Sequence, residues 1–246
     1  MRLNWRRVQR IPGSVLRQVV VLFFTLLSLF PVYFMLVSSL KTKADYLENK
    51  FNLPPHPILD NFLTAFAGEK FLIRFANSTI LTVGAVGISL LIACLAAYAF
   101  ARMQFAGKRT LFNLMLSLMV VPPVVMVVPL FVTMVRLKLI NTYQGAILIY
   151  IGLLLPFSIY MMTNFFQTIP HEIIDAARID GCSNFGVFAR ILMPLSAPAV
   201  ITLIVVNALW VWNELLIALI FLQRDEMKTL MVGIASMRSR IYVDIP

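Results

Sequence analysis

EIIDAARIDGCSNFGVFARILMP, residues 172–194, is a polar and helix-forming stretch that lies between two of the most apolar segments of the chain. The contrast matters because 60% of the 246 residues are apolar and only 13% are charged, with a mean hydropathy of +0.87. A soluble domain of this length cannot hide so much apolar surface from water. The composition therefore predicts an all-α, polytopic bundle of transmembrane helices that is interrupted by a water-compatible loop.

Several apolar segments are long enough to cross a hydrocarbon core of roughly 30 Å, which takes about 20 helical residues. None shows the period-two alternation of a transmembrane β-barrel. The first run is too long for the apolar core of a signal peptide, and no small-residue cleavage site follows it, so we expect it to remain as a helix. The predicted spans are residues 18–40, 77–100, 111–135, 143–166 and 196–222.

Prolines occur inside two of these predicted spans. Because proline has no N–H, it frees backbone carbonyls that neighbouring helices or a wet cavity must satisfy in lipid. Kinked helices around an aqueous path and ordinary packing kinks both remain open as explanations. The residues concerned are Pro122, Pro123, Pro129 and Pro156.

The distribution of basic residues predicts the orientation in the membrane. The formal net charge of +10 is scattered between apolar segments, so it indicates topology rather than nucleic-acid binding. Residues 1–17 and the link after the second span are basic and free of acidic residues, which places both in the cytoplasm. Loop 167–195 then also faces the cytoplasm, whereas segments 41–76 and 223–246 face outside. The basic residues counted are Arg2, Arg6, Arg7, Arg10, Arg17, Arg102, Lys108 and Arg109.

The polar stretch predicts two short helices joined by a turn. Pro170 suits a first helical turn, and Glu172 and Asp175 complement the dipole at that helix N-terminus. Gly181 is a natural stop, because glycine adopts positive φ without a Cβ penalty. The expected face of the first helix can contact a partner, or it can rest on the membrane surface with no partner. The residues sharing that face are Ile173, Ala176 and Ala177, with Asp180 one turn further on.

The same stretch resembles the EAA loop of the inner-membrane permease subunits of binding-protein-dependent ATP-binding-cassette importers. That loop has Glu-Ala-Ala, three residues, Gly, nine residues and Ile-x-Leu-Pro. Here Asp175-Ala176-Ala177 precedes Gly181 by three residues, and nine residues separate Gly181 from Ile191-Leu192-Met193-Pro194. Asp175 replaces glutamate and Met193 replaces leucine, while every interval is kept.

The resemblance extends over most of the chain, from about Pro54 to Leu222. NLPPHPILDNFLTAF and RFANSTI are similar to the first external loop of carbohydrate-type, maltose-permease-like members. VPPVVMVVPLFVTMVRLKLINTYQGAILIY and LLPFSIYMMTNFFQTIP are similar to their core, and VWNELLIALIFL to a later span. Such members have a sixth span, which this chain does not reach before Pro246. A truncated sequence or a frameshifted gene is the simpler expectation, and a genuine terminus that leaves the bundle open where the last helix would pack is the alternative.

The resemblance implies a permease subunit of an ATP-driven importer of sugars or oligosaccharides in the inner membrane. Its implied partners are two ATPase subunits, a second permease and an extracytoplasmic solute-binding protein. ATP would bind to the ATPase, so no cofactor is expected on this chain. The implied coupling helix docks on the ATPase and transmits its closure to alternating access. Its implied docking residues are Glu172, Asp175, Ala176, Ala177, Asp180 and Gly181.

An ionisable residue inside a span is costly and is a functional candidate by default. Glu214 is the clearest one, and on a continuous helix it shares a face with Asn207 and Trp210, followed by Ala218 and Phe221. Aromatic, amide and carboxylate groups together suit a sugar in a solute path. The alternative is a lipid-facing tryptophan and an interfacial or inter-subunit carboxylate. Weaker candidates are Tyr143 and Gln144, and Asn213 is expected to pack against a neighbouring helix.

No catalytic pattern accompanies these features. GKRT at 107–110 lacks the glycine that a phosphate-binding loop needs five residues earlier, where Arg102 stands. Cys94 and Cys182 predict neither a disulfide framework nor a metal site, and His56 and His171 are expected to be solvated. The chain is therefore not expected to be an enzyme. A permease for another solute, a secondary transporter and a non-transporting scaffold remain as alternatives.

Overall fold

The computed structural model describes residues 10–68 and 70–243. Arg2, Arg6 and Arg7, on which part of the orientation argument rests, lie outside the described residues, as do the last three residues of segment 223–246. The chain divides into two compact units, residues 1–70 and 71–246. The secondary structure of the described residues is helical throughout, with no strand.

The first unit contains one long apolar helix and two short ones. Helix α2 runs from Arg10 to Ser39, α3 from Lys43 to Glu48 and α4 from Asp60 to Gly68. The Thr42 hydroxyl caps α3 by accepting the Asp45 N–H at 3.1 Å. The Asn61 side chain donates to the Ser39 and Lys41 carbonyls, both at 2.9 Å, and so holds α4 against the end of α2.

The second unit is a helical bundle built around α5, Phe71–Arg102, and α8, Tyr143–Thr168. These two helices pack along each other, and α12, Ala197–Asn213, packs on both. The helices can approach α5 closely because buried residues recur at every fourth position along it, and most of them have small side chains. These buried residues are Leu81, Ala85, Ser89, Ala93 and Ala97, each at most 1% exposed.

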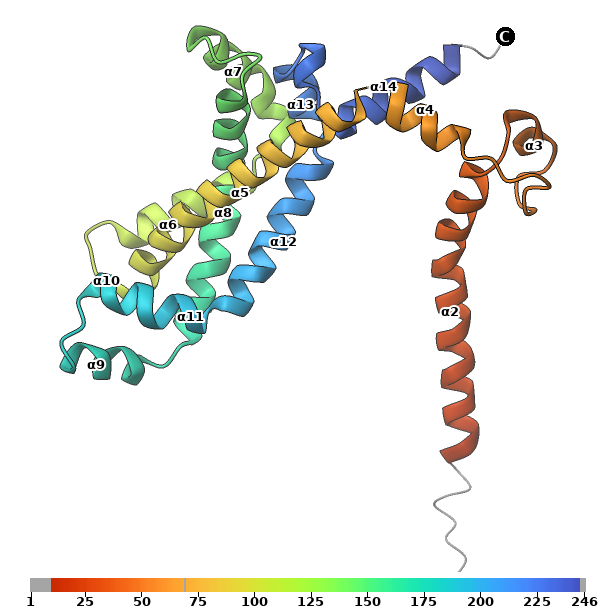
Figure 1. Cartoon of the computed structure of the whole chain (residues 1–246). Coiled ribbons are helices and arrows are strands. Elements are labelled where there is room, and N and C mark those ends of the chain that lie inside the picture. The colour runs from red at the N-terminus through yellow and green to blue at the C-terminus, as the bar shows by residue number, and fades with distance from the viewer. Residues whose placement is uncertain (1–9, 69, 244–246) are drawn as a thin grey trace, which may run out of the picture. The chain divides into compact units, whose positions relative to one another are not determined.

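Shorter helices occupy the two ends of this bundle. At one end lie α9, His171–Ile179, α10, Asn184–Val187, a π-helical turn at Phe188–Leu192, and α11, Met193–Leu195 (Figure 1). Toward the other end lie α7, Pro123–Arg136, and α13, Leu216–Phe221 (Figure 1). Helix α6 is Lys108–Leu118, a 3-10 turn covers Asp225–Met227, and α14 is Leu230–Val243.

Two predicted spans are interrupted and are not continuous helices. The predicted span 111–135 breaks between α6 and α7 with a bend of 100°, because Pro122 and Pro123 cannot donate the backbone N–H bonds that a continuous helix needs. The predicted span 196–222 ends as a helix at Asn213 and resumes at Leu216 as α13. The predicted helical face that joined Glu214 to Ala218 and Phe221 therefore does not exist.

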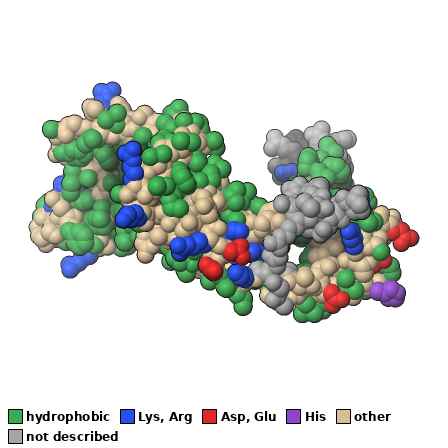
Figure 2. All heavy atoms as spheres, turned by 90° about the horizontal axis from the view of Figure 1, so that it is seen from above, with side chains coloured by type: hydrophobic (Ala, Val, Ile, Leu, Met, Phe, Trp, Pro, Cys, Tyr) green, Lys and Arg blue, Asp and Glu red, His purple; other side chains and the backbone are tan. Residues whose placement is uncertain are grey.

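The described helices carry the apolar exterior of a membrane protein. Three of them are long and apolar enough to cross a bilayer, or up to five if each bent pair counts as one span. Large apolar side chains such as Val83, Leu91 and Ile201 are more than 60% exposed, and green apolar side chains cover much of the face in Figure 2. Lipid is the solvent in which such a surface costs no free energy.

Candidate functional site

The polar stretch folds as predicted into two short helices with a glycine between them. Pro170 is the N-cap of α9, and Asp180 is its C-cap. Gly181 has φ of +84°, and the Cys182 N–H donates to the Ala177 carbonyl at 2.9 Å, which closes the end of the helix. Ser183 then caps α10 by accepting the Gly186 N–H at 3.1 Å. The turn is thus set by backbone bonds that require a left-handed residue at position 181.

Gly181→Val is expected to reduce transport at least several-fold while membrane insertion is unchanged. A built Cβ at Gly181 meets no heavy atom within 4 Å, so the penalty comes from the backbone alone. A β-branched residue in the left-handed region costs about 1–2 kcal/mol or more, whereas asparagine tolerates it. Solute uptake of Gly181→Val and Gly181→Asn, at equal membrane levels, measures the difference. Equal uptake by the two variants would contradict the assigned role of the turn.

Helix α9 has one face packed on the bundle and one face free. Ile174 and Ala177 are 2% and 6% exposed and join the buried cluster that contains Phe166, Val187 and Leu192. The opposite face combines acidic, apolar and small side chains, and it includes Ile179 at 87% exposure. The exposed residues between positions 172 and 181 are Glu172, Ile173, Asp175, Ala176, Arg178, Ile179, Asp180 and Gly181.

Ala177 differs from the other five predicted docking residues. Its side chain points into the bundle, so the expectation that it shares an outer face with Ala176 was wrong. The reason is the 3.6-residue period: Ile174 is the apolar anchor, and position 177 follows it on the same face one turn later. The small side chain of Ala177 lets α9 lie close to the buried cluster.

The end of α5 holds both helices of the loop. The Tyr98 hydroxyl donates to the Asn184 carbonyl at 3.0 Å, and its ring lies 5.4 Å from the ring of Phe188. The Arg102 guanidinium donates to the Phe166 and Ile169 carbonyls, where α8 ends. It also lies 3.1 Å from Nε2 of His171, the first residue of α9. These contacts attach both helices of the loop to the ends of α5 and α8.

A cavity of about 590 Å³ lies between α7, α8 and α12, with the end of α6 at its edge. Two of the three predicted path residues line it. Asn207 is 1% exposed and donates to the Ser158 hydroxyl at 2.9 Å, while the Trp210 ring meets Tyr150 edge to face at 6.2 Å. Pro156 also lines the cavity, and it has no N–H to donate to the carbonyl of Gly152, another lining residue.

Glu214 is not among the residues that line this cavity. Its carboxylate oxygens accept the Ile217 N–H at 3.0 and 2.9 Å and the Ala218 N–H at 3.2 Å, which caps the first turn of α13. The Tyr150 hydroxyl donates to the same carboxylate at 3.1 Å. The charge is thus held by protein donors at a break between two helices, and a role as a solute ligand stays a prediction.

Glu214→Ala is expected to lower the thermal stability of the protein, because it leaves two backbone N–H groups and the Tyr150 hydroxyl without their acceptor. Each buried group left unsatisfied costs about 1–3 kcal/mol. Glu214→Gln keeps an acceptor oxygen and should lose less. Melting temperatures of the purified protein, read by tryptophan fluorescence, distinguish the variants. A melting temperature of Glu214→Ala equal to that of the unaltered chain would contradict the capping role.

The weaker candidates have structural partners of their own. The Tyr143 hydroxyl donates to the Asn77 side-chain oxygen at 2.6 Å, and the Asn77 amide holds the Glu226 and Lys228 carbonyls. Gln144 is exposed. Asn213 bonds back to the Leu209 carbonyl of its own helix at 2.7 Å, so the expected packing of its side chain against a neighbouring helix was wrong.

Cys94 and Cys182 are free thiols, and both pack in or against the cluster beneath α9. Within residues 10–68 and 70–243 no group of three metal-ligating side chains is brought together.

Sequence reasoning missed the residues that attach the loop to the bundle. In the sequence Arg102 indicates only the topology, and no pattern singles out Tyr98. A signal for Arg102 existed, because a basic side chain at the end of one long helix can satisfy the last carbonyls of another. Phe185, 69% exposed on the second helix of the loop, was also missed. No spacing argument distinguishes it from a buried aromatic residue.

The bundle has an apolar exterior and a cavity between its helices, and its polar two-helix loop is attached to the two central helices. This is the architecture of a membrane transport subunit. Comparison with known proteins agrees with this class. The family model described as "Binding-protein-dependent transport system inner membrane component" matches residues 89–242. The chain belongs to this family. The family consists of transport components, which confirms the prediction that the chain is not an enzyme.

Individual relatives match over nearly the whole chain. The arabinooligosaccharides transport system permease protein AraQ of Bacillus subtilis (strain 168) is 36% identical over 233 residues, covering 92% of this chain and 82% of AraQ. The melibiose/raffinose/stachyose import permease protein MelC of the same organism is 32% identical, covering 83% of this chain and 74% of MelC. These matches extend the similarity beyond the residues that the family model covers.

A solved structure shares the fold. A chain from the crystal structure of a bacterial ABC transporter involved in the import of the acidic polysaccharide alginate superposes with a TM-score of 0.77. The match covers 100% of this chain and 85% of that one, at 21% sequence identity. The predicted all-α transmembrane permease fold is confirmed by this likeness.

Proposed function

We propose that this chain is a permease subunit of an ATP-driven importer of sugars or oligosaccharides, with loop 167–195 as its contact with the ATPase. The N-terminus and this loop face the cytoplasm, and the complete importer contains two ATPase subunits, a second permease and an extracytoplasmic binding protein. ATP binds to the ATPase, and this chain carries no cofactor of its own.

The observation that carries the proposal is the two-faced packing of α9. Its inner face is locked into the bundle by Ile174 and Ala177, and its outer face exposes Ile173, Ala176 and Ile179 among carboxylates. Exposed apolar and small side chains on a helix at the end of a membrane bundle favour a protein partner over water. The ion pair between Arg178 and Asp175, at 3.8 Å and largely exposed, contributes little to the fold itself.

The attachments of the loop support a mechanism for coupling. Closure of the ATPase dimer would shift α9, and Arg102 and Tyr98 would carry that shift into α5, while Phe166 and Ile169 would carry it into α8. The cavity beside Asn207 and Trp210 is bounded by α8 and α12, so movement of α8 changes its access. The breaks at Pro122–Pro123 and at Glu214–Leu215 are the places where the remaining helices can adjust.

The chemistry of the cavity and the names of the relatives support a sugar as the solute. The Trp210 ring and the Asn207 amide lie at one cavity, together with the Gly152 carbonyl, to which Pro156 has no N–H to donate. An indole face can stack on the apolar face of a sugar, and the amide and carbonyl can bond its hydroxyls. AraQ and MelC are named for arabinooligosaccharides and for melibiose, raffinose and stachyose.

The direct test is reconstitution of the complete transporter from its own operon in lipid vesicles, with the binding protein added outside. We expect ATP hydrolysis to be stimulated by the binding protein loaded with one class of oligosaccharide, and that solute to accumulate on the ATP-hydrolysing side. Uptake that proceeds without the ATPase, driven by an ion gradient, would contradict the proposal. Stimulation by amino acids, peptides or metal ions in place of sugars would contradict the solute assignment alone.

Gly152→Leu is expected to reduce solute transport at least ten-fold without lowering stability. A Cβ built on Gly152 meets nothing within 4 Å, because the residue faces the cavity, so leucine fills free space rather than displacing packed atoms. Within a helix leucine is also favoured over glycine by about 0.8 kcal/mol. Uptake and melting temperature are measured together, with Gly87→Leu as the control, since Gly87 also meets nothing within 4 Å but does not line the cavity. Unchanged uptake in Gly152→Leu would contradict the path assignment.

A further inference from the structure

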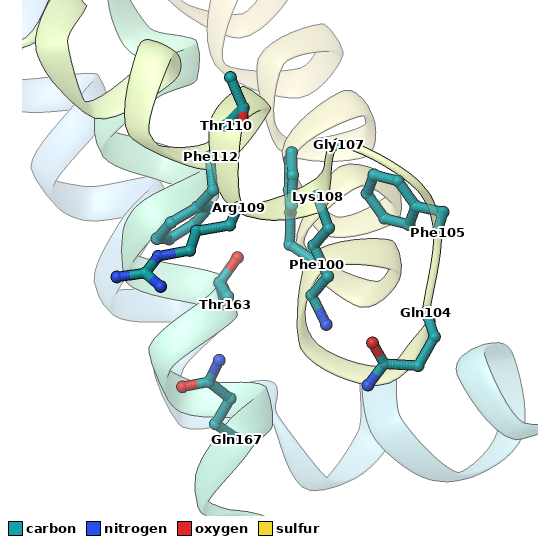
Figure 3. A pocket seen from close by; sticks show the side chains of 10 residues that line it. All are labelled: Phe100, Gln104, Phe105, Gly107, Lys108, Arg109, Thr110, Phe112, Thr163 and Gln167. Atoms are coloured by element: carbon teal, nitrogen blue, oxygen red, sulfur yellow. The ribbon is translucent and has the colours of Figure 1, made fainter.

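A second pocket, of about 550 Å³, lies at the loop end of the bundle, between the end of α5, the start of α6 and the last turns of α8. It is separate from the cavity between α7, α8 and α12 and shares no lining residue with it. Figure 3 shows its ten lining side chains, which combine aromatic rings with basic and amide groups. They are Phe100, Gln104, Phe105, Gly107, Lys108, Arg109, Thr110, Phe112, Thr163 and Gln167.

The polar lining is made of hydrogen-bond donors and carries a net positive charge. Lys108 and Arg109 are its charged members, and no carboxylate is among the ten residues. The Lys108 ammonium donates to the Met103 carbonyl at 2.8 Å, which leaves two of its three N–H groups for another acceptor. Within the part of the chain that the structure describes, the Arg109 guanidinium has no side-chain partner. Such a lining attracts an anion.

The backbone at the start of α6 adds donors of its own. Gly107 is the N-cap of this 11-residue helix, with φ of 78°, and it has no side chain to cap the first turn. The Leu111 N–H bonds to the Gly107 carbonyl, so the N–H groups of Arg109 and Thr110 are the unpaired ones of the first turn. Unpaired N–H groups at a helix N-terminus form a standard anion site.

Thr163 is an independent observation that points to a ligand at this pocket. It is 1% exposed, it lines the pocket from α8, and its buried hydroxyl has no hydrogen-bond partner. In Figure 3 it lies between the side chains of Arg109 and Lys108. A buried hydroxyl without a partner costs about 1–3 kcal/mol, so a ligand that accepts its proton relieves a penalty built into the fold.

The aromatic wall distinguishes an amphiphile from a simple ion. The Phe100 ring lies 5.7 Å from the Phe105 ring and 5.2 Å from the Phe112 ring, so three neighbouring rings form part of the lining. The pocket also lies where the apolar helices α5 and α8 approach their ends, and the ends of helices long enough to span a bilayer are where lipid headgroups are expected. Basic pockets between transmembrane helices at this depth fit anionic headgroups.

We propose that this pocket binds the phosphate group of an anionic phospholipid from the leaflet at the loop end of the bundle. Lys108, Arg109, the first-turn N–H groups of α6 and the Thr163 hydroxyl hold the phosphate oxygens. The glycerol and the start of the acyl chains lie against the three phenylalanine rings. The bound lipid braces α6 against the last turns of α8, one residue away from the carbonyls that Arg102 holds at Phe166.

The test is lipid titration of the purified full-length chain in its complex, followed by native mass spectrometry. The probes are phosphatidylglycerol, phosphatidylcholine with the same acyl chains, and inorganic phosphate as a competitor. We expect one tightly retained phosphatidylglycerol per permease copy, at least ten-fold weaker retention of phosphatidylcholine, and little displacement by millimolar phosphate. Equal retention of the two lipids would overturn the proposal, and full displacement by inorganic phosphate would show a free-anion site instead of a lipid site.

Thr163→Val is the most informative variant, because valine keeps the shape of threonine and removes only the hydroxyl. An empty pocket predicts that this exchange is neutral or stabilising, since it removes an unsatisfied buried group. The lipid site predicts about ten-fold weaker phosphatidylglycerol retention, with recovery in Thr163→Ser. Retention by Thr163→Val equal to that of the unaltered chain, in protein whose melting temperature is unchanged, would overturn the proposal.

Arg109→Gln is a second variant and is expected to weaken retention about ten-fold. Its matched control is Arg136→Gln, which removes the same charge from an exposed residue in the last turn of α7. Equal loss in both variants would mean that net charge, and not this pocket, attracts the lipid, and would overturn the proposal.

Discussion

Replacing Ala176 by glutamate is expected to abolish import. Ala176 lies on the free face of α9, between the exposed carboxylates of Glu172 and Asp180 along the helix, so the longer charged side chain is tolerated by the fold. On that face it would separate α9 from a partner that approaches its backbone closely, and it would add a further negative charge. A desolvated, unpaired charge in an interface costs several kcal/mol. Uptake should fall at least 100-fold, while the amount of permease in the membrane stays the same.

The matched control is Ala106→Glu, the same exchange at an exposed residue in the link between α5 and α6. That variant should retain uptake within a few-fold, because the link is not part of loop 167–195. Co-purification of the ATPase with each variant completes the measurement and should fail only for Ala176→Glu. Import by Ala176→Glu at the unaltered rate would contradict the role of α9 as the docking helix.

Arg102→Gln is expected to uncouple ATP hydrolysis from import. The guanidinium joins the end of α5 to the Phe166 and Ile169 carbonyls and to His171. Glutamine is shorter and cannot reach all three, so at least one buried carbonyl at the end of α8 loses its donor, at a cost of about 1–3 kcal/mol. We expect uptake to fall at least ten-fold while the ATPase stays bound and basal hydrolysis continues.

Stimulation of ATP hydrolysis by the loaded binding protein is the readout for this variant, because a merely destabilised permease would lose the ATPase altogether. Arg136→Gln, at the end of α7, serves as the control for loss of a helix-terminal arginine. Full stimulation in Arg102→Gln would mean that the contact holds the fold but does not transmit movement.

Much of the fold could be predicted because it follows from composition and period. Apolar runs of the right length located α5 and α8 to within a few residues, and the glycine at 181 has the positive φ that the turn required. The breaks inside the predicted spans 111–135 and 196–222 were harder. Hydropathy is averaged over a window of residues, so its value does not change when a single N–H is missing. Pro122 and Pro123 therefore predicted a possible kink and not a break.

Only some features of the candidate sites could be predicted, because burial and contacts between helices are not visible in the sequence. The position of Gly181 in the loop predicted the turn. Only the packed structure distinguishes the buried Ala177, beside Ile174, from the exposed Ala176. Asn207 and Trp210 meet at one cavity as their shared helical face suggested. Glu214 does not, because the helix ends one residue earlier and its carboxylate caps α13. No helical wheel can show where a helix stops.

The measurement that tests the central claim most directly is site-specific photo-crosslinking of the intact transporter in its membrane. A photoreactive residue placed at Ala176 is predicted to cross-link to the ATPase subunit, and the yield should change when ATP is bound and hydrolysis is blocked. The same probe at Gln144, an exposed residue in the first turn of α8, should give no cross-link to the ATPase. A probe at Ala176 that labels only lipid, or that labels the ATPase no better than the probe at Gln144, would contradict the assignment of loop 167–195 as the coupling contact.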